Sequence, residues 1–117
     1  MKTPKIIILA ALIVFSFTTN AQDKKKTEEI TIKTSVVCNM CKYNVEKAMA
    51  YEKGVKKSNV KVQEQTVTIL FDPKKTSPEK IKKAITMAGY DADEMLADPK
   101  AYEKLDACCK KDNEVHE

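Results

Sequence analysis

Two cysteines, Cys38 and Cys41, with two residues between them, lie in the stretch "VVCNMCKYNVEKAM", where an apolar run gives way to an amphipathic one. Thiols at this spacing have three chemical uses: a disulfide, a dithiol–disulfide redox couple, or the ligand set of a soft metal ion. A purely structural disulfide is disfavoured, because it would close a very short loop and add little stability. The redox and metal interpretations then have to be separated by the rest of the chain.

The residues around the pair predict that it lies where a strand meets a helix. Residues 30–36 alternate apolar and polar side chains, which is the pattern of a strand with one buried face. From Cys41 onward the apolar residues fall at helical spacing, and Gly54 is placed to end that helix. Both sulfurs can therefore converge on one ion. The helix dipole and the neighbouring Lys42 are expected to favour the thiolate form.

The elements after this helix are predicted as a hairpin, a second helix and a closing strand. They cover residues 60–62 and 67–71, 78–88, and 90–96, and a last short helix is expected over 100–107. The order strand, helix, strand, strand, helix, strand predicts an α+β fold. We expect the ferredoxin-like βαββαβ sandwich, a four-stranded antiparallel sheet with two helices on one face, plus the C-terminal helix.

The ligand types of the pair indicate which ion it would bind. Two thiolates with no histidine beside them suit a soft, low-coordinate ion such as Cu(I) better than Zn(II), which prefers four ligands. Met40, between the cysteines, is a candidate thioether ligand, although methionine more commonly fills gaps in packing. A site left open on one side allows an incoming thiolate to join the ion and remove it.

A second group of potential ligands, Cys108, Cys109 and His116, lies near the end of the chain. In the ferredoxin-like order the closing strand leads away from the first pair, and a tail helix of about ten residues returns about 15 Å. The tail cysteines are therefore candidate additional ligands, which would raise the coordination number and allow Zn(II) or a small Cu(I) cluster. The alternative leaves them to intermolecular disulfides or to no particular role, with His116 as a solvated bystander.

The first 21 residues have the pattern of a secretory signal peptide. Lys2 and Lys5 precede an apolar run over residues 6–17, and Ala21 is a plausible cleavage point. The apolar run is too short for a stable membrane anchor. We expect an exported, periplasmic chain without membrane attachment in its mature form. Its expected parts are a signal peptide (1–21), a disordered lysine-rich leader (22–29), a metal-binding domain (30–97) and a C-terminal tail (98–117).

The composition argues against several classes of function. Every basic residue is lysine, so the arginine fork that favours phosphate and base recognition is missing, and we expect no nucleic-acid partner. The chain has one histidine and two glycines, without a hydrolytic triad or a phosphate-binding loop, so we expect no enzyme. A thioredoxin-like oxidoreductase is the serious alternative. It is disfavoured because no tryptophan precedes Cys38 and because the elements that follow do not match the thioredoxin order.

Taken together, residues 30–96 resemble the heavy-metal-associated domain family, which includes copper chaperones, the periplasmic mercury-binding protein and domains of metal-pumping ATPases. The matching stretches are "CNMCKYNVEKAM", "NVKVQEQTVTILFDP" and "SPEKIKKAITMAGYDADEM". The resemblance implies that Cys38 and Cys41 are the ligands and that Tyr90 shields them. It implies Cu(I), with Zn(II) or Hg(II) as alternatives, and a metal-transporting ATPase, efflux component or other metalloprotein as donor or acceptor. Because the thiols must be reduced, a thiol-reducing system is a further expected partner.

Overall fold

The computed structural model describes residues 27–117 of the chain. The expected signal peptide, residues 1–21, lies outside the described residues, as does most of the expected leader. Within residues 27–117, no helix combines the length and the hydrophobicity that crossing a membrane requires.

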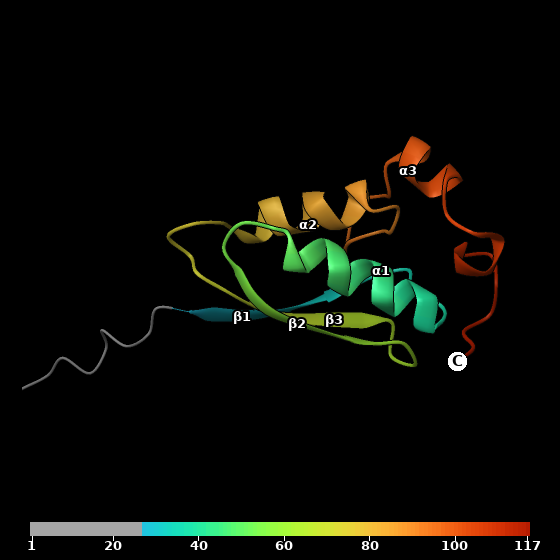
Figure 1. Ribbon diagram of the computed structural model, residues 1–117, viewed down its shortest axis with the longest axis horizontal. Coiled ribbons are helices and arrows are strands. Elements are labelled where there is room, and N and C mark those ends of the chain that lie inside the picture. Colours follow the sequence, from blue (N-terminus) through green and yellow to red (C-terminus); the bar gives the residue numbers. More distant parts are fainter. Residues whose placement is uncertain (1–26) are drawn as a thin grey trace, which may run out of the picture.

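The described chain forms an antiparallel sheet covered on one face by two helices (Figure 1). The strands lie in the order β1-β3-β2, with Ile30 opposite Ile69 and Val60 opposite Val67. The elements are β1 (Glu28–Lys33), α1 (Asn39–Ala50), β2 (Val55–Lys61), β3 (Thr66–Phe71), α2 (Pro78–Met87), α3 (Pro99–Glu103) and the 3-10 turn η2 (Ala107–Cys109). The first five have the order that the sequence predicts.

Local chemistry explains where the two main helices begin and end. The Ser77 hydroxyl caps α2 by accepting a hydrogen bond from the Lys80 backbone N–H at 3.3 Å, and Pro78 occupies the first turn. Gly54 follows α1 with a φ of 89°, and Gly89 follows α2 with a φ of 104°. Such positive φ angles favour glycine. The second helix ends at Met87, one residue before the predicted end, whereas α1 ends at Ala50, earlier than the end near Lys53 that Gly54 predicts.

The core lies between the sheet and the helices. It contains the inward side chains of the strands, the buried faces of α1 and α2, and the residues that connect β1 to α1. Its members include Ile32, Val36, Val37, Val45, Met49, Val60, Val67, Ile69, Phe71, Ile81, Ile85 and Tyr90. The cysteines Cys38, Cys41 and Cys109 belong to the same cluster, so the candidate site is continuous with the core.

The expected closing strand over residues 90–96 is not formed in the described part of the chain. The segment makes isolated bridges, between Thr34 and Ala92 and between Ala92 and Met95. Hydrogen bonds exchanged by Ala92 and Met95, with Asp93 at a φ of 52°, close a tight turn there. The prediction of a fourth strand was wrong because this turn reverses the chain before it can run along β1.

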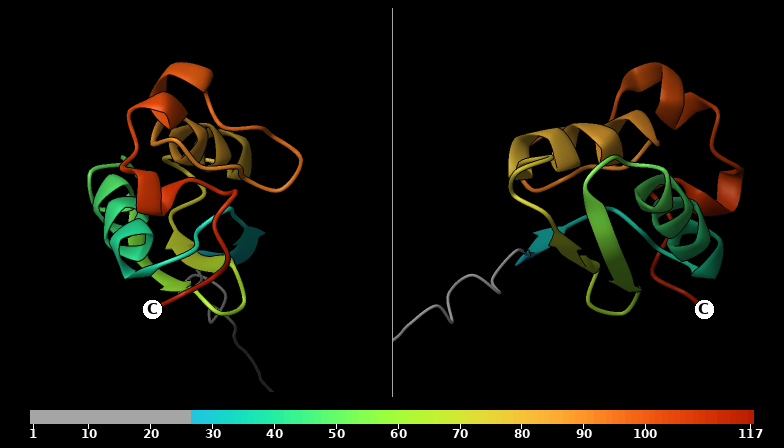
Figure 2. Two further views of the ribbon diagram at one scale, coloured as in Figure 1. Left: turned by 90° about the vertical axis from the view of Figure 1, so that its right-hand side faces the viewer. Right: turned by 60° about the vertical axis from the view of Figure 1, so that its left-hand side comes forward.

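The residues after this turn form two short helical pieces in place of the single helix expected over 100–107. Asp98 caps α3 by accepting a hydrogen bond from the Ala101 backbone N–H at 3.0 Å, and η2 follows three residues after α3 ends. The chain then descends past the amino-terminal end of α1 (Figures 1 and 2). The C-terminal tail, residues 98–117, therefore reaches the turn that carries Cys38 and Cys41.

Candidate metal centre

The predicted cysteine pair lies at the amino-terminal end of α1. Cys38 is the N-cap residue, with an extended backbone, and Cys41 lies in the first helical turn. Their Sγ atoms are 3.5 Å apart. Both side chains are buried, with exposed fractions of 5% and 0%. The strand-to-helix junction thus directs two sulfurs at a common point.

The tail cysteines return to this pair. The Sγ atom of Cys109, which is 1% exposed, lies 4.0 Å from the Sγ atom of Cys38. The exposed Cys108 places its sulfur within 4.8 Å of the sulfurs of Cys38 and Cys109. Cys41 is outside this group of three, because its sulfur is not within 4.8 Å of every member. The Cys38 sulfur is therefore close both to Cys41 and to the tail cysteines.

The distances from the Cys38 sulfur to its two neighbours each suit a pair of thiolates on one soft ion. Metal–thiolate bonds of about 2.3 Å allow two sulfurs on one ion to lie at most about 4.6 Å apart. The separations from Cys38 to Cys41 and to Cys109, 3.5 Å and 4.0 Å, fall below that limit. A donor set of thiolates favours soft ions over hard ions such as Mg²⁺ or Ca²⁺.

The backbone around Cys38 lowers the pKa of its thiol, which favours the thiolate form that binds metal. Burial alone would raise the pKa of Cys38, but hydrogen bonds from the backbone N–H groups of Cys41 and Met40 and from the thiols of Cys41 and Cys109 lower it below its ordinary value. Lys42 was expected to contribute to this effect. Its Nζ atom instead contacts Glu46 at 3.0 Å and the Val60 carbonyl oxygen at 2.8 Å, so its charge is paired elsewhere.

The pKa of the Cys109 thiol shifts in the opposite direction. Burial raises the pKa of its thiol, and the hydrogen bond and charge of Cys41 raise it further. Tyr90 is a fully buried neighbour of both thiols, and its hydroxyl accepts a hydrogen bond from Asn44 Nδ2 at 3.0 Å. Burial, with the nearby Cys41 and Cys109, raises the pKa of Tyr90, so the phenol stays neutral. Its role as a shield for the cysteines stays a prediction.

The other two candidate ligands, Met40 and His116, are both exposed, and a role for Met40 as a ligand stays a prediction. The Met40 side chain is 45% exposed. His116 is exposed, does not belong to the group formed by Cys38, Cys108 and Cys109, and its Nδ1 atom lies 2.8 Å from the Glu114 carbonyl oxygen. The contact that brings His116 near the site is made by its backbone, whose N–H donates to the Val37 carbonyl oxygen at 2.6 Å.

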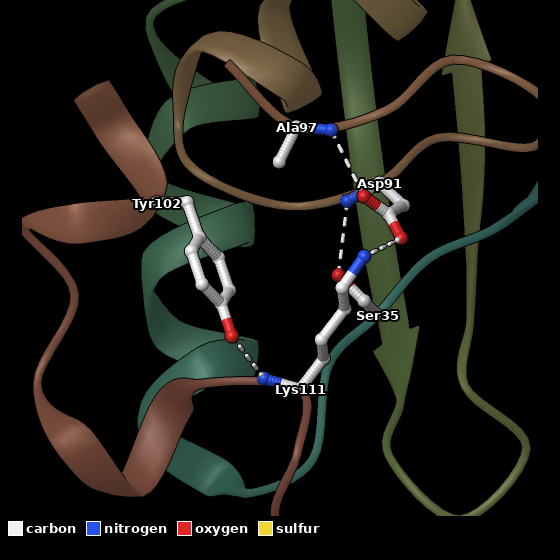
Figure 3. Close-up of polar contacts among 5 residues, drawn as sticks. All are labelled: Ser35, Asp91, Ala97, Tyr102 and Lys111. Carbon is white, nitrogen blue, oxygen red and sulfur yellow. Dashed lines mark hydrogen bonds and ion pairs between the residues drawn. The ribbon is translucent and has the colours of Figure 1, made fainter. Parts of the chain in front are cut away.

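A polar clasp, formed by Ser35, Asp91, Tyr102 and Lys111, was not foreseen from the sequence (Figure 3). The Asp91 carboxylate pairs with Lys111 Nζ at 3.0 Å, and its backbone N–H donates to the Ser35 hydroxyl at 2.9 Å. The Lys111 backbone N–H donates to the Tyr102 hydroxyl at 3.2 Å. These contacts join segments far apart in the chain, which no periodic pattern links. The clasp connects the tail to the segment between β1 and the cysteine turn.

The family model of the heavy-metal-associated domain matches residues 31–91, which is more than half of the chain. The chain belongs to this family. The match includes Cys38 and Cys41 and ends at Asp91, so the tail that carries Cys108 and Cys109 lies beyond it.

Individual relatives agree with the family. The chain is 35% identical over 74 residues to copper-transporting ATPase 1 of Rattus norvegicus, which covers 62% of this chain and 5% of the ATPase. It is 35% identical over 65 residues to the mercuric transport protein periplasmic component of Serratia marcescens, covering 55% of this chain and 71% of that protein. The chain thus spans a small part of the ATPases and most of the mercuric protein.

Solved structures show the same fold. Oxidised MerP from Ralstonia metallidurans CH34 superposes with a TM-score of 0.55 at 33% identity, covering 56% of this chain and 93% of that chain. The CopZ metallochaperone superposes with a TM-score of 0.54 at 27% identity, covering 56% of this chain and 98% of that chain. The ferredoxin-like arrangement of this family is therefore shared, although the described residues hold three strands in one sheet.

Proposed function

We propose that this chain is an exported soft-metal carrier in which Cys38 and Cys41 hold a Cu(I) ion as thiolates. The observation that supports it most is the buried pair of sulfurs, 3.5 Å apart at the start of α1, in a heavy-metal-associated domain. We further propose the division into signal peptide (1–21), leader (22–29), metal-binding domain (30–97) and tail (98–117). A periplasmic location is supported by the name of the mercuric transport relative.

The choice of Cu(I) rests on the number and softness of the ligands. The pair supplies two thiolates, which satisfy a low-coordinate monovalent copper ion but leave Zn(II) short of its usual four ligands. The relatives are named for copper and for mercury, so Hg(II) is the second candidate cargo.

Delivery would proceed by exchange of thiolates. A thiolate of the partner adds to the bound ion, a sulfur of this chain leaves and takes up a proton, and repetition transfers the ion. The partner would be a metal-transporting ATPase, an efflux component or another metalloprotein. Because a disulfide between Cys38 and Cys41 would block binding, the carrier would depend on a thiol-reducing system in its compartment. No observation on the described residues favours a dithiol–disulfide oxidoreductase instead.

The test is a competition titration of the chain 22–117, which keeps every contact described above. The reduced protein is titrated anaerobically with Cu(I) against a chromophoric chelator, with Zn(II) in parallel. The Cys38→Ser/Cys41→Ser variant is titrated beside it, after circular dichroism has established that it folds. We expect tight Cu(I) binding by the parent chain and a loss of at least about 100-fold in affinity in the variant, because the ion loses both of its first thiolates.

Two results would overturn the proposal. One is failure of the reduced parent chain to compete for Cu(I). The other is Cu(I) affinity that survives the double substitution, which would place the ion elsewhere. An insulin-reduction assay of the parent chain tests the oxidoreductase alternative, and we expect no activity above that of the double variant.

A further inference from the structure

The C-terminal tail covers the cysteine turn and accepts hydrogen bonds from both of its thiols. The Cys38 thiol donates to the Cys108 carbonyl oxygen at 3.6 Å, and the Cys41 thiol donates to the Cys109 carbonyl oxygen at 3.7 Å. The Cys109 side chain itself is buried in the core cluster beside them. The tail therefore covers the cysteine turn, and both thiols of the first pair contact its backbone.

Anchors on both sides of the tail cysteines hold this arrangement. Before them, Leu105 packs against the core, and after them Lys111 joins the polar clasp through Asp91 and Tyr102 (Figure 3). Closer to the chain end, Val115 packs against the core. The His116 backbone N–H donates to the carbonyl oxygen of Val37, the residue before Cys38. The segments before and after Cys109 thus both hold it in position.

The positions of the sulfurs allow the tail to bind an ion directly. The Cys109 sulfur lies 4.0 Å from that of Cys38, within reach of an ion that the two share. A bond from Cys109 to the ion would add to the contacts that Leu105, Lys111 and Val115 already make with the domain.

We infer that Cys109 is a third thiolate ligand, so that the soft ion is held by Cys38, Cys41 and Cys109 in a site closed by the tail. This inference rests on the proposed metal site at Cys38 and Cys41. The tail lies beyond the residues that match the family, so the third ligand is a feature of this chain's own extension. Three thiolates satisfy a trigonal Cu(I) or Hg(II) ion and still leave Zn(II) one ligand short.

Cys108 has a different position and a different role. Its side chain is exposed, while its sulfur remains within 4.8 Å of the sulfurs of Cys38 and Cys109. An exposed thiol beside a buried site can receive an ion from outside and pass it inward by exchange of thiolates. We therefore expect Cys108 to affect the rate of metal entry and Cys109 to affect the affinity.

The experiment compares two matched variants, Cys109→Ser and Cys108→Ser, which differ by one position along the chain. Each reduced protein, residues 22–117, is titrated anaerobically with Cu(I) against a competing chelator, and copper X-ray absorption counts the sulfurs on the ion. We expect three sulfurs in the parent chain and in Cys108→Ser, and two in Cys109→Ser. We expect the affinity to fall at least about tenfold in Cys109→Ser, and to fall less in Cys108→Ser than in Cys109→Ser.

Cys109→Ala serves as a second variant, because it keeps the buried position apolar if serine disturbs folding. Thermal unfolding of the metal-free variants establishes that each is folded, and sedimentation at the working concentration establishes that the loaded protein is a monomer. A third sulfur that appears only in a dimer would overturn the inference. The same holds if Cys109→Ser and Cys109→Ala keep the parent's affinity and sulfur count.

The outcomes also separate this inference from the proposed function. If the parent chain binds Cu(I) with two sulfurs and tail substitutions change nothing, the carrier proposal stands and the third ligand is excluded. If the parent chain does not bind Cu(I) at all, the carrier proposal itself fails.

Discussion

Cys38 and Cys109 carry the same functional group in opposite surroundings. Backbone N–H groups at the start of α1 lower the pKa of Cys38, whereas burial raises the pKa of Cys109. The Cys38 thiol is therefore the easier of the two to ionise, and the Cys109 thiol is the harder.

A first prediction at this scale concerns Tyr90. Replacing Tyr90 with Phe removes the hydroxyl that accepts the Asn44 hydrogen bond and leaves the buried ring in place. We expect a loss of about 1 kcal/mol in the free energy of unfolding, since one partly buried hydrogen bond is lost. Chemical denaturation measures it. The matched Tyr43→Phe variant changes an exposed ring and should stay within about 0.5 kcal/mol.

Equal losses in both tyrosine variants would contradict a special role for the buried hydroxyl. The Cu(I) affinity of Tyr90→Phe should stay close to that of the parent chain, because the buried ring remains in place. A large loss of affinity would instead make the hydroxyl part of the metal centre.

Single residues also mark how far the site could be predicted from the sequence. Cys38 and Cys41 could be located because their spacing and the change from strand to helix pattern are local signals. Cys109 could be named as a candidate, but its burial depends on the route of the tail. The pairing of Asp91 with Lys111 could not be predicted, because it joins two loops whose relative position follows from packing alone.

The position of α3 depends on Gly89, the glycine that follows α2. Gly89 has a φ of 104°, and a Cβ atom there would lie 3.1 Å from the Ala101 carbonyl oxygen and 3.1 Å from Leu105 side-chain atoms. A side chain at Gly89 would therefore oppose both the backbone conformation and the contact with α3. The glycine sets how closely the start of the tail approaches the domain.

We accordingly expect Gly89→Ala to lower the free energy of unfolding by about 1–2 kcal/mol, because alanine disfavours this backbone region. It should also speed alkylation of the buried Cys109 thiol by loosening the tail. Thermal unfolding and mass spectrometry of alkylated protein measure the two effects. Lys100→Ala, at an exposed position of α3, is the matched control and should change stability by less than about 0.5 kcal/mol.

If Gly89→Ala leaves the alkylation rate unchanged, the position of α3 does not control access to the Cys109 thiol.

The helices and strands also show why some elements could be predicted from the sequence and others could not. The first five follow periodic patterns, caps and glycines, which act within a few residues. The expected fourth strand failed because Asp93 adopts a positive φ in a turn that competes with extension along β1.

At the scale of the whole molecule, ion pairs connect the later segments to one another and to α2. Lys82 of α2 lies 3.4 Å from Asp93 and 3.2 Å from Glu94, in the turn that replaces the fourth strand. Lys111 pairs with Asp91 at 3.0 Å. These contacts hold the turn after Tyr90 between the second helix and the tail, so its position depends on the protonation of carboxylates.

The stability of the fold should therefore fall in acid partly through Glu94. A hydrogen bond to its own backbone N–H and one to Lys82 hold the pKa of Glu94 below its ordinary value. Its contribution is thus present above the ordinary value and is lost as the pH falls through the lowered one. We expect Glu94→Gln to show a smaller decrease in melting temperature between pH 7 and pH 2 than the parent chain.

Lys82→Met removes one of the two hydrogen bonds and should give an intermediate pH profile. The effect should be small, because the pair is exposed to solvent. Identical profiles for all three proteins would show that the Lys82–Glu94 pair contributes nothing measurable to folding.

The missing fourth strand leaves β1 at the border of the described sheet, where the turn after Tyr90 reaches only its last residue, through hydrogen bonds between Asp93 and Lys33. Three of the six residues of β1 are charged and exposed: Glu28, Glu29 and Lys33. Charges at such a border discourage strand addition and hence aggregation. The charges on β1 therefore oppose the association of two copies of this chain along their sheet edges.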